Sequence, residues 1–68
     1  MNEVKEHRTA EGLTQEDLAR ELGVSRQSII SIERGRYTPS LMLAFRMAAF
    51  FGCTVDDLFR RKGGKRGR

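Results

Sequence analysis

The chain has 68 residues, a formal net charge of +4 and a single cysteine, and this length allows one small domain. A domain of this size buries only about 60% of the surface of its unfolded chain, so oligomerisation is the main remaining way to add buried area. Cys53 has no second cysteine with which to form an internal disulfide, and His7 is the only histidine, which excludes a Cys/His zinc cluster.

The sequence shows no nucleophile–base arrangement and no phosphate-binding loop, so we predict no enzyme, no catalytic residue, no metal and no cofactor. Cys53 has no resolving cysteine and is interpreted as a packing residue rather than a redox switch. No small-molecule site is visible. The charged N-terminus lacks a signal-peptide core, and no apolar run approaches the roughly 18 residues of a membrane span. We therefore expect a soluble, cytoplasmic protein with no membrane contact.

The positive charge is concentrated at the end of the chain. Residues 60–68 contain six Lys or Arg residues and no acid, so the rest of the chain is slightly acidic. We predict one folded domain over residues 1–59 and a disordered basic tail over residues 60–68. Within the domain, acidic residues dominate the first third, whereas Arg26, Arg34 and Arg36 follow with few acids between them. This distribution predicts one positive face.

Five helices and no strands are predicted from N-cap residues and from the spacing of apolar side chains. Thr14, Ser25, Ser40 and Thr54 stand where they can cap the helices that follow. The two threonines have an aspartate three residues later, as in a capping box. The predicted helices span about residues 3–11, 15–22, 26–34, 41–51 and 55–59. The fold class is therefore all-α, a compact five-helix bundle.

Helical spacing also predicts which side chains form the core of this bundle. The second and third helices alone cannot enclose the apolar residues, so the other three helices must complete the shell. The predicted core contains Val4, Leu13, Leu18, Leu22, Val24, Ile29, Ile32, Leu41, Ala44, Met47, Ala48, Phe51, Val55 and Leu58.

Residues 15–34 predict two short amphipathic helices joined by a tight turn. Gly23 lies where the first of them must turn left-handed, which glycine does without steric cost. Ala19 lies where a larger side chain would push the two helices apart. The second helix presents Arg26 and Gln27, side chains that can form paired hydrogen bonds with guanine and adenine in the major groove. This arrangement is a helix-turn-helix, and it predicts sequence-specific binding to double-stranded DNA.

Two stretches carry a wider resemblance: GLTQEDLARELGVSRQSIISIERGR at residues 12–36 and TPSLMLAFRMAAFFGCTVDDLF at residues 38–59. They resemble the Cro/repressor helix-turn-helix family, also called the XRE family. Helix spacing, caps, glycines and the intervening loop all agree. The resemblance implies a lambda-repressor-like DNA-binding domain over nearly the whole chain except the basic tail.

In that family the third helix lies in the major groove, and the Gln that opens the second helix binds a phosphate. The resemblance implies these roles for residues 26–34 and for Gln15. It also implies that the loop from Arg34 to Tyr37 follows the sugar-phosphate backbone. The expected DNA-binding residues are Gln15, Ser25, Arg26, Gln27, Ile30, Ser31, Arg34, Arg36 and Tyr37.

Several of these residues have a second interpretation. Ile30 is either an ordinary exposed isoleucine or a contact to a thymine methyl group. Ser31 either contacts a base or only allows close approach, which is the preferred interpretation. Tyr37 either packs in the core or donates its hydroxyl to a phosphate. Gln15 has the clearest physical argument, because a helix N-terminus attracts phosphate and the amide can donate one more hydrogen bond.

The resemblance also implies a structural ion pair between Arg8 in the first helix and Glu33 at the end of the third. The alternative for Glu33 is a solvated surface acid. Many relatives have an aliphatic residue where this chain has His7, which makes the packing of the first helix the least predictable part of the fold.

The fourth predicted helix, LMLAFRMAAFF, is apolar on nearly all sides, with Arg46 as its only charge. A stripe of Met42, Phe45 and Ala49 lies on a face other than the predicted core face. Relatives usually have polar or charged residues at one or more of these positions. We predict that the stripe is a homodimer interface; the alternative is that the tail or a loose first helix accommodates it.

The predicted function is that of a transcriptional regulator, most simply a repressor, which binds a palindromic operator as a homodimer at the nucleoid. One alternative is an antitoxin-like DNA-binding protein that binds a protein partner through the fourth helix and the tail. Another is a non-specific nucleic-acid adaptor driven by the basic tail. The varied polar face of the third helix favours specific recognition.

Overall fold

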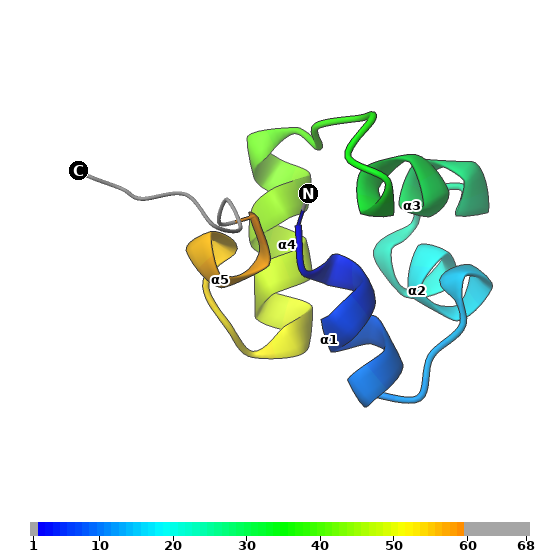
Figure 1. Cartoon of the computed structure of the whole chain (residues 1–68), viewed down its shortest axis with the longest axis horizontal. Helices are drawn as coiled ribbons and strands as arrows, with labels where there is room; N and C mark the ends of the chain where they lie inside the picture. Colours follow the sequence, from blue (N-terminus) through cyan, green and yellow to red (C-terminus); the bar gives the residue numbers. More distant parts are fainter. Residues whose placement is uncertain (1, 60–68) are drawn as a thin grey trace.

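The computed structural model describes residues 2–59, and the predicted tail at residues 60–68 lies outside this range. The described residues form helices and no strand, which confirms the all-α fold (Figure 1). The helices are α1 (Val4–Ala10), α2 (Gln15–Leu22), α3 (Arg26–Glu33), α4 (Leu41–Phe51) and α5 (Val55–Phe59). In Figure 1, α2 and α3 form one end of the molecule and α5 the other, with α1 and α4 between them. None of the helices in residues 2–59 is long and apolar enough to cross a membrane.

Helices α2 to α5 begin directly after the residues that were predicted to be their N-caps. Thr14 Oγ1 accepts a hydrogen bond from the Asp17 backbone N–H at 2.9 Å, and Asp17 Oδ2 accepts one from the Thr14 N–H at 3.0 Å. These bonds, together with Arg20, hold the pKa of Asp17 below its usual range. A second capping box begins α5. Ser25 and Ser40 each accept a backbone N–H at 3.1 Å, so four of the five helix starts are set by residues close in sequence.

The core lies where all five helices meet. Its fully buried side chains come from α1, α2, α3, α4 and α5. They are Val4, Leu18, Ile29, Ile32, Met47 and Leu58. The predicted core residues Val24, Phe51 and Val55 are half-buried and pack against its edge, and Leu13 is half-buried as well.

One core prediction is wrong. Leu41 was placed inside, but 67% of its surface is exposed, whereas Leu43 is 9% exposed and belongs to the core. The cause is the composition of α4, which is apolar on nearly all sides. Its periodicity therefore identifies a buried face only approximately, and the packing of α4 against α5 and α2 decides the rotation of the helix.

Hydrogen bonds at the start of the chain connect the beginning of α1 to α3 and to α5. The Asn2 amide donates to the carbonyl oxygen of Ile32 at 2.6 Å, and its oxygen accepts from the first turn of α1. The Glu3 N–H donates to the Leu58 carbonyl at 2.8 Å. The His7 ring packs on Phe51 with ring centroids 5.6 Å apart. The histidine therefore fills an aliphatic position by aromatic packing, and α1 is well anchored.

Leu58 provides the sharpest test of this packing, with Leu41 as the matched control. Leu58 is fully buried, so Leu58→Ala leaves a cavity and should lower the free energy of unfolding by about 2–5 kcal/mol. Leu41→Ala makes the same chemical change on the surface and should cost less than about 0.5 kcal/mol in dilute, monomeric protein. Urea denaturation followed by circular dichroism measures both. Equal losses would contradict the assigned rotation of α4 and the placement of α5.

Candidate nucleic-acid interface

The packing of α2 on α3 fixes the geometry of the interface. Ala19 is 3% exposed on α2, which packs against α3, and a small side chain at a helix contact allows close approach. Gly23 has φ of 72°, and the N–H of the following Val24 donates to the Ala19 carbonyl at 3.0 Å. This left-handed turn ends α2 and starts α3 after two more residues. The predicted helix-turn-helix is therefore present in the backbone.

An unpredicted contact from α4 stabilises the same turn. Arg46 Nη2 donates to the carbonyl oxygen of Leu22 at 2.6 Å, at the end of α2 where carbonyl groups lack helical partners. A cation at this end also interacts favourably with the negative end of the helix dipole. The single charge of α4 thus connects that helix to the turn between α2 and α3.

The first turn of α3 presents two exposed polar side chains, Arg26 and Gln27. Ser25 is exposed as well, but its hydroxyl oxygen is engaged in the cap and lies 3.0 Å from the Ser28 hydroxyl. One turn later, Ile30 and Ser31 are half-buried. The face therefore combines two long polar side chains at its front with small or apolar groups behind them, and Arg and Gln are side chains that can pair with bases in a major groove.

The segment after α3 continues this face with positive charge. Arg34 and Arg36 are exposed, and the Arg36 N–H donates to the Ser31 carbonyl at 2.9 Å. Tyr37 is 48% exposed, so the interpretation that it packs in the core is wrong. Its contact with a phosphate remains a prediction.

Glu33 does not add a free negative charge to this face. Arg8 Nε donates to Glu33 Oε2 at 2.6 Å and Arg8 Nη2 donates to Oε1 at 3.2 Å. The two side chains are 9% and 5% exposed. Arg8 Nη1 also donates to the Leu13 carbonyl at 2.8 Å, just before α2. The ion pair therefore joins α1, the segment before α2, and the end of α3.

Gln15, the expected phosphate contact, belongs to the same group. Its Nε2 donates to Glu33 Oε1 at 3.2 Å, across 18 positions of sequence. Sequence patterns did not indicate this contact, because it depends on the distance between the start of α2 and the end of α3. Gln15 is half-buried and lines a surface hollow together with Ile30 and Arg34 of the α3 segment.

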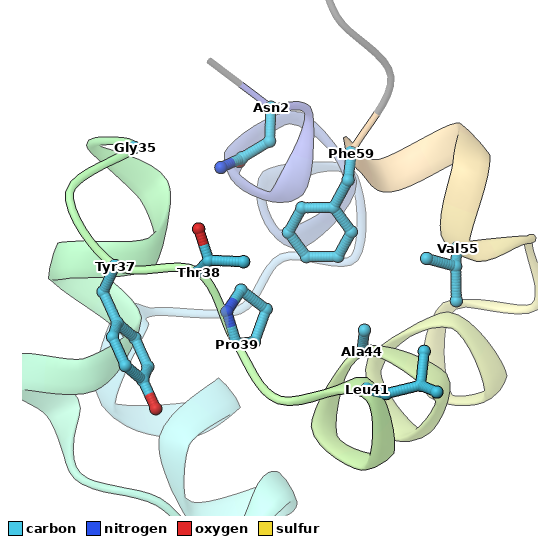
Figure 2. A pocket seen from close by; sticks show the side chains of 9 residues that line it. All are labelled: Asn2, Gly35, Tyr37, Thr38, Pro39, Leu41, Ala44, Val55 and Phe59. Carbon is cyan, nitrogen blue, oxygen red and sulfur yellow. The ribbon is translucent and has the colours of Figure 1, made fainter.

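A second feature lies on the other side of the loop after α3. Figure 2 shows a pocket of about 500 Å³ between this loop, α4, α5 and the start of the chain. It is lined by Asn2, Gly35, Tyr37, Thr38, Pro39, Leu41, Ala44, Val55 and Phe59. Beside Leu41 on α4, Met42 is 71% and Phe45 is 54% exposed, and Ala49 is exposed too. The pocket and the apolar face of α4 adjoin each other at Leu41.

The remaining reactive side chains form no site of their own. Burial, and then the nearby charge of Asp57, raise the pKa of the Cys53 thiol, which keeps it protonated at neutral pH. Cys53 packs against the core. Within residues 2–59, no group of three or more His, Cys, Asp or Glu side chains is arranged to hold a metal ion.

Known proteins resemble this chain in sequence and in fold. A family profile described as helix-turn-helix matches residues 4–58, which is nearly all of the described structure. The chain belongs to the XRE-like helix-turn-helix family of transcriptional regulators. This family consists of DNA-binding proteins rather than enzymes.

Similar regulators occur in archaea and bacteria. An uncharacterized HTH-type transcriptional regulator of Methanocaldococcus jannaschii is 59% identical over 58 residues, which cover 85% of this chain and 88% of the relative. A Bacillus subtilis relative with the same description is 43% identical over 58 residues, with the same coverage. A crystal structure of a hypothetical transcription factor from Neisseria is similar with a TM-score of 0.73 and 30% identity. That match covers 84% of this chain and 66% of the Neisseria chain.

A second ion pair within residues 2–59, between Arg20 and Asp17, allows a controlled test of the Arg8–Glu33 contact. Arg8→Met keeps the length of the side chain but leaves a nearly buried carboxylate without its cation. It should lower the free energy of unfolding by about 3–5 kcal/mol. The control is Arg20→Met, because the Arg20–Asp17 pair is 65% and 36% exposed and should contribute less than about 1 kcal/mol. Thermal denaturation of both variants decides the matter, and an Arg8 variant as stable as the Arg20 variant would contradict the assigned role.

Proposed function

We propose that the regulator binds a palindromic operator as a homodimer, with α3 of each subunit in the major groove. The observation that supports this most strongly is the exposure of Arg26 and Gln27 at the front of an α3 whose angle is fixed by α2 and the buried ion pair. Arg26 can donate to guanine O6 and N7 together, and Gln27 can pair with adenine N6 and N7. Ile30 and Ser31 allow α3 to approach the bases closely.

Contacts to the DNA backbone surround these bases in the proposal. Gln15 and Ser25, at the N-termini of α2 and α3, lie where backbone N–H groups also attract phosphate. Arg34, Arg36 and Tyr37 extend along the other side of α3. These contacts fix the orientation of the protein on DNA, whereas Arg26 and Gln27 carry the sequence preference. The basic residues 60–68 add sequence-independent attraction to phosphates.

The homodimer is proposed from the apolar face of α4. Leu41, Met42, Phe45 and Ala49 are exposed on one side of this helix. A second copy can cover them through a two-fold axis, because such an interface is self-complementary. The adjoining pocket offers room for the partner's apolar side chains. The same face would serve a different protein in an antitoxin-like role, and the oligomeric state distinguishes the two.

The proposed recognition of base sequence by α3 is tested with Arg26→Ala and Gln27→Ala on a duplex selected from random DNA. Each variant should lose about 1–3 kcal/mol of binding free energy and relax the preference at one base pair, because each removes one base contact. The matched control is Arg20→Ala, which removes an exposed positive charge from α2. Fluorescence anisotropy with matched and mismatched duplexes measures both effects. Full affinity and preference in both α3 variants would show that another surface selects the sequence.

The dimer interface is tested with Phe45→Glu, which places two like charges opposite each other in a dry contact. The variant should sediment as a monomer at micromolar concentration and bind the selected duplex much more weakly. Two α3 helices would no longer be held about 34 Å apart, which is one turn of DNA. Ala10→Glu adds the same charge to an exposed position of α1 and should leave the dimer intact. A wild-type protein that is monomeric both free and on DNA would contradict the homodimer. The apolar face of α4 would then bind a different partner.

A further inference from the structure

The Glu33 carboxylate has a second partner besides Arg8. Its Oε1 accepts hydrogen bonds from Arg8 Nη2 and from Gln15 Nε2, both at 3.2 Å, while Oε2 accepts from Arg8 Nε at 2.6 Å. The Glu33 side chain is only 5% exposed. A nearly buried carboxylate needs its acceptor positions filled, so the Gln15 amide is part of what satisfies it.

The position of this carboxylate is fixed by groups other than Gln15. Arg8 binds it in a side-on, two-bond arrangement and also donates to the Leu13 carbonyl at 2.8 Å. Two parallel hydrogen bonds hold both the distance and the orientation of a carboxylate. The acceptor oxygen that Gln15 meets is therefore held in place relative to the start of α2.

This acceptor determines how the Gln15 amide is oriented. An ionised carboxylate only accepts hydrogen bonds, so it favours the NH₂ group and repels the carbonyl oxygen of the amide. An amide nitrogen has two hydrogens, and the bond to Glu33 uses one of them. The other N–H remains for a second acceptor. Gln27 differs in this respect, because within residues 2–59 its exposed amide makes no hydrogen bond.

We propose that Glu33 is a positioning residue for DNA binding, which holds the Gln15 amide so that its free N–H is presented to a backbone phosphate. This inference rests on the proposed function, in which Gln15 contacts the DNA backbone. A negative side chain can do this beside DNA because Arg8 neutralises it. The ion pair thus has two roles, one in joining the helices and one in preparing a phosphate contact before DNA arrives.

A double-mutant cycle separates the two roles. Glu33→Asp keeps the charge but withdraws the carboxylate from Gln15, and Gln15→Met keeps the side-chain length but removes both amide hydrogens. Each single variant should weaken binding to the selected duplex by about 3- to 10-fold, the effect of one hydrogen bond. The double variant should bind no more weakly than Gln15→Met. The dependence on salt should not change, because no charge on the protein is altered.

The contrary outcomes are distinct. If Glu33→Asp weakens binding equally in the Gln15 and the Gln15→Met backgrounds, Glu33 acts only through the stability of the fold, and the proposal is wrong. A Glu33→Asp variant with wild-type affinity would overturn it as well. A wild-type protein that does not distinguish the selected duplex from random DNA overturns the proposed function, and this role with it. Melting temperatures of all four proteins show how much of any loss comes from unfolding.

A measurement on the unaltered protein decides the matter if Glu33→Asp does not fold. Gln15 and Gln27 are the two glutamines of the chain, so their side-chain amides can be compared directly by ¹⁵N relaxation. In the DNA-free protein, the Gln15 amide should have an order parameter near that of rigid backbone, about 0.85, and the Gln27 amide one below about 0.6. Equal mobility of the two amides would show that Glu33 does not hold Gln15, and would overturn the proposal.

Discussion

The buried Glu33 carboxylate is the constraint on which the placement of α1, α2 and α3 depends. Its two oxygens bind Arg8 from α1 and Gln15 from α2, and it lies at the last residue of α3. Removing a carboxylate from water is costly unless hydrogen bonds replace the lost hydration, so one helix cannot shift without exposing or unpairing this group. The orientation of α3 relative to α1 and α2 therefore depends on the contacts of Glu33 with Arg8 and Gln15.

The remaining helices support this arrangement from the opposite side. α4 contacts the end of α2 through Arg46, and the start of the chain reaches the last turn of α3 through Asn2. Arg46 satisfies a carbonyl at the end of α2, and Asn2 adds a second hydrogen bond to the Ile32 carbonyl, which also accepts from the Gly35 N–H at 3.0 Å. The face of α3 that carries Arg26 and Gln27 takes no part in this framework, which leaves these side chains free for recognition. The apolar face of α4, beginning at Leu41, is similarly unused within the domain.

Local features of the fold could be predicted from the sequence, and contacts between distant segments could not. The caps at Thr14 and Ser25 and the turn at Gly23 depend on residues within a few positions, so residue type alone indicates them. The error at Leu41 arose because a helix apolar on nearly all sides has no unique buried face. The bond between Gln15 and Glu33 depends on how two helices cross, which periodicity does not determine. The Arg8–Glu33 pair was foreseen only through the family resemblance.

Chemical-shift mapping tests the central claim most directly, namely that DNA binds the outer face of α3 and the groups beside it. ¹⁵N-labelled protein is titrated with a duplex selected from random DNA, and backbone amide shifts are followed for residues 2–59. The account predicts the largest changes at residues 25–31 and 34–37 and at the start of α2, with α5 little affected. A selected duplex that left residues 25–31 unchanged, while shifting residues elsewhere, would contradict it.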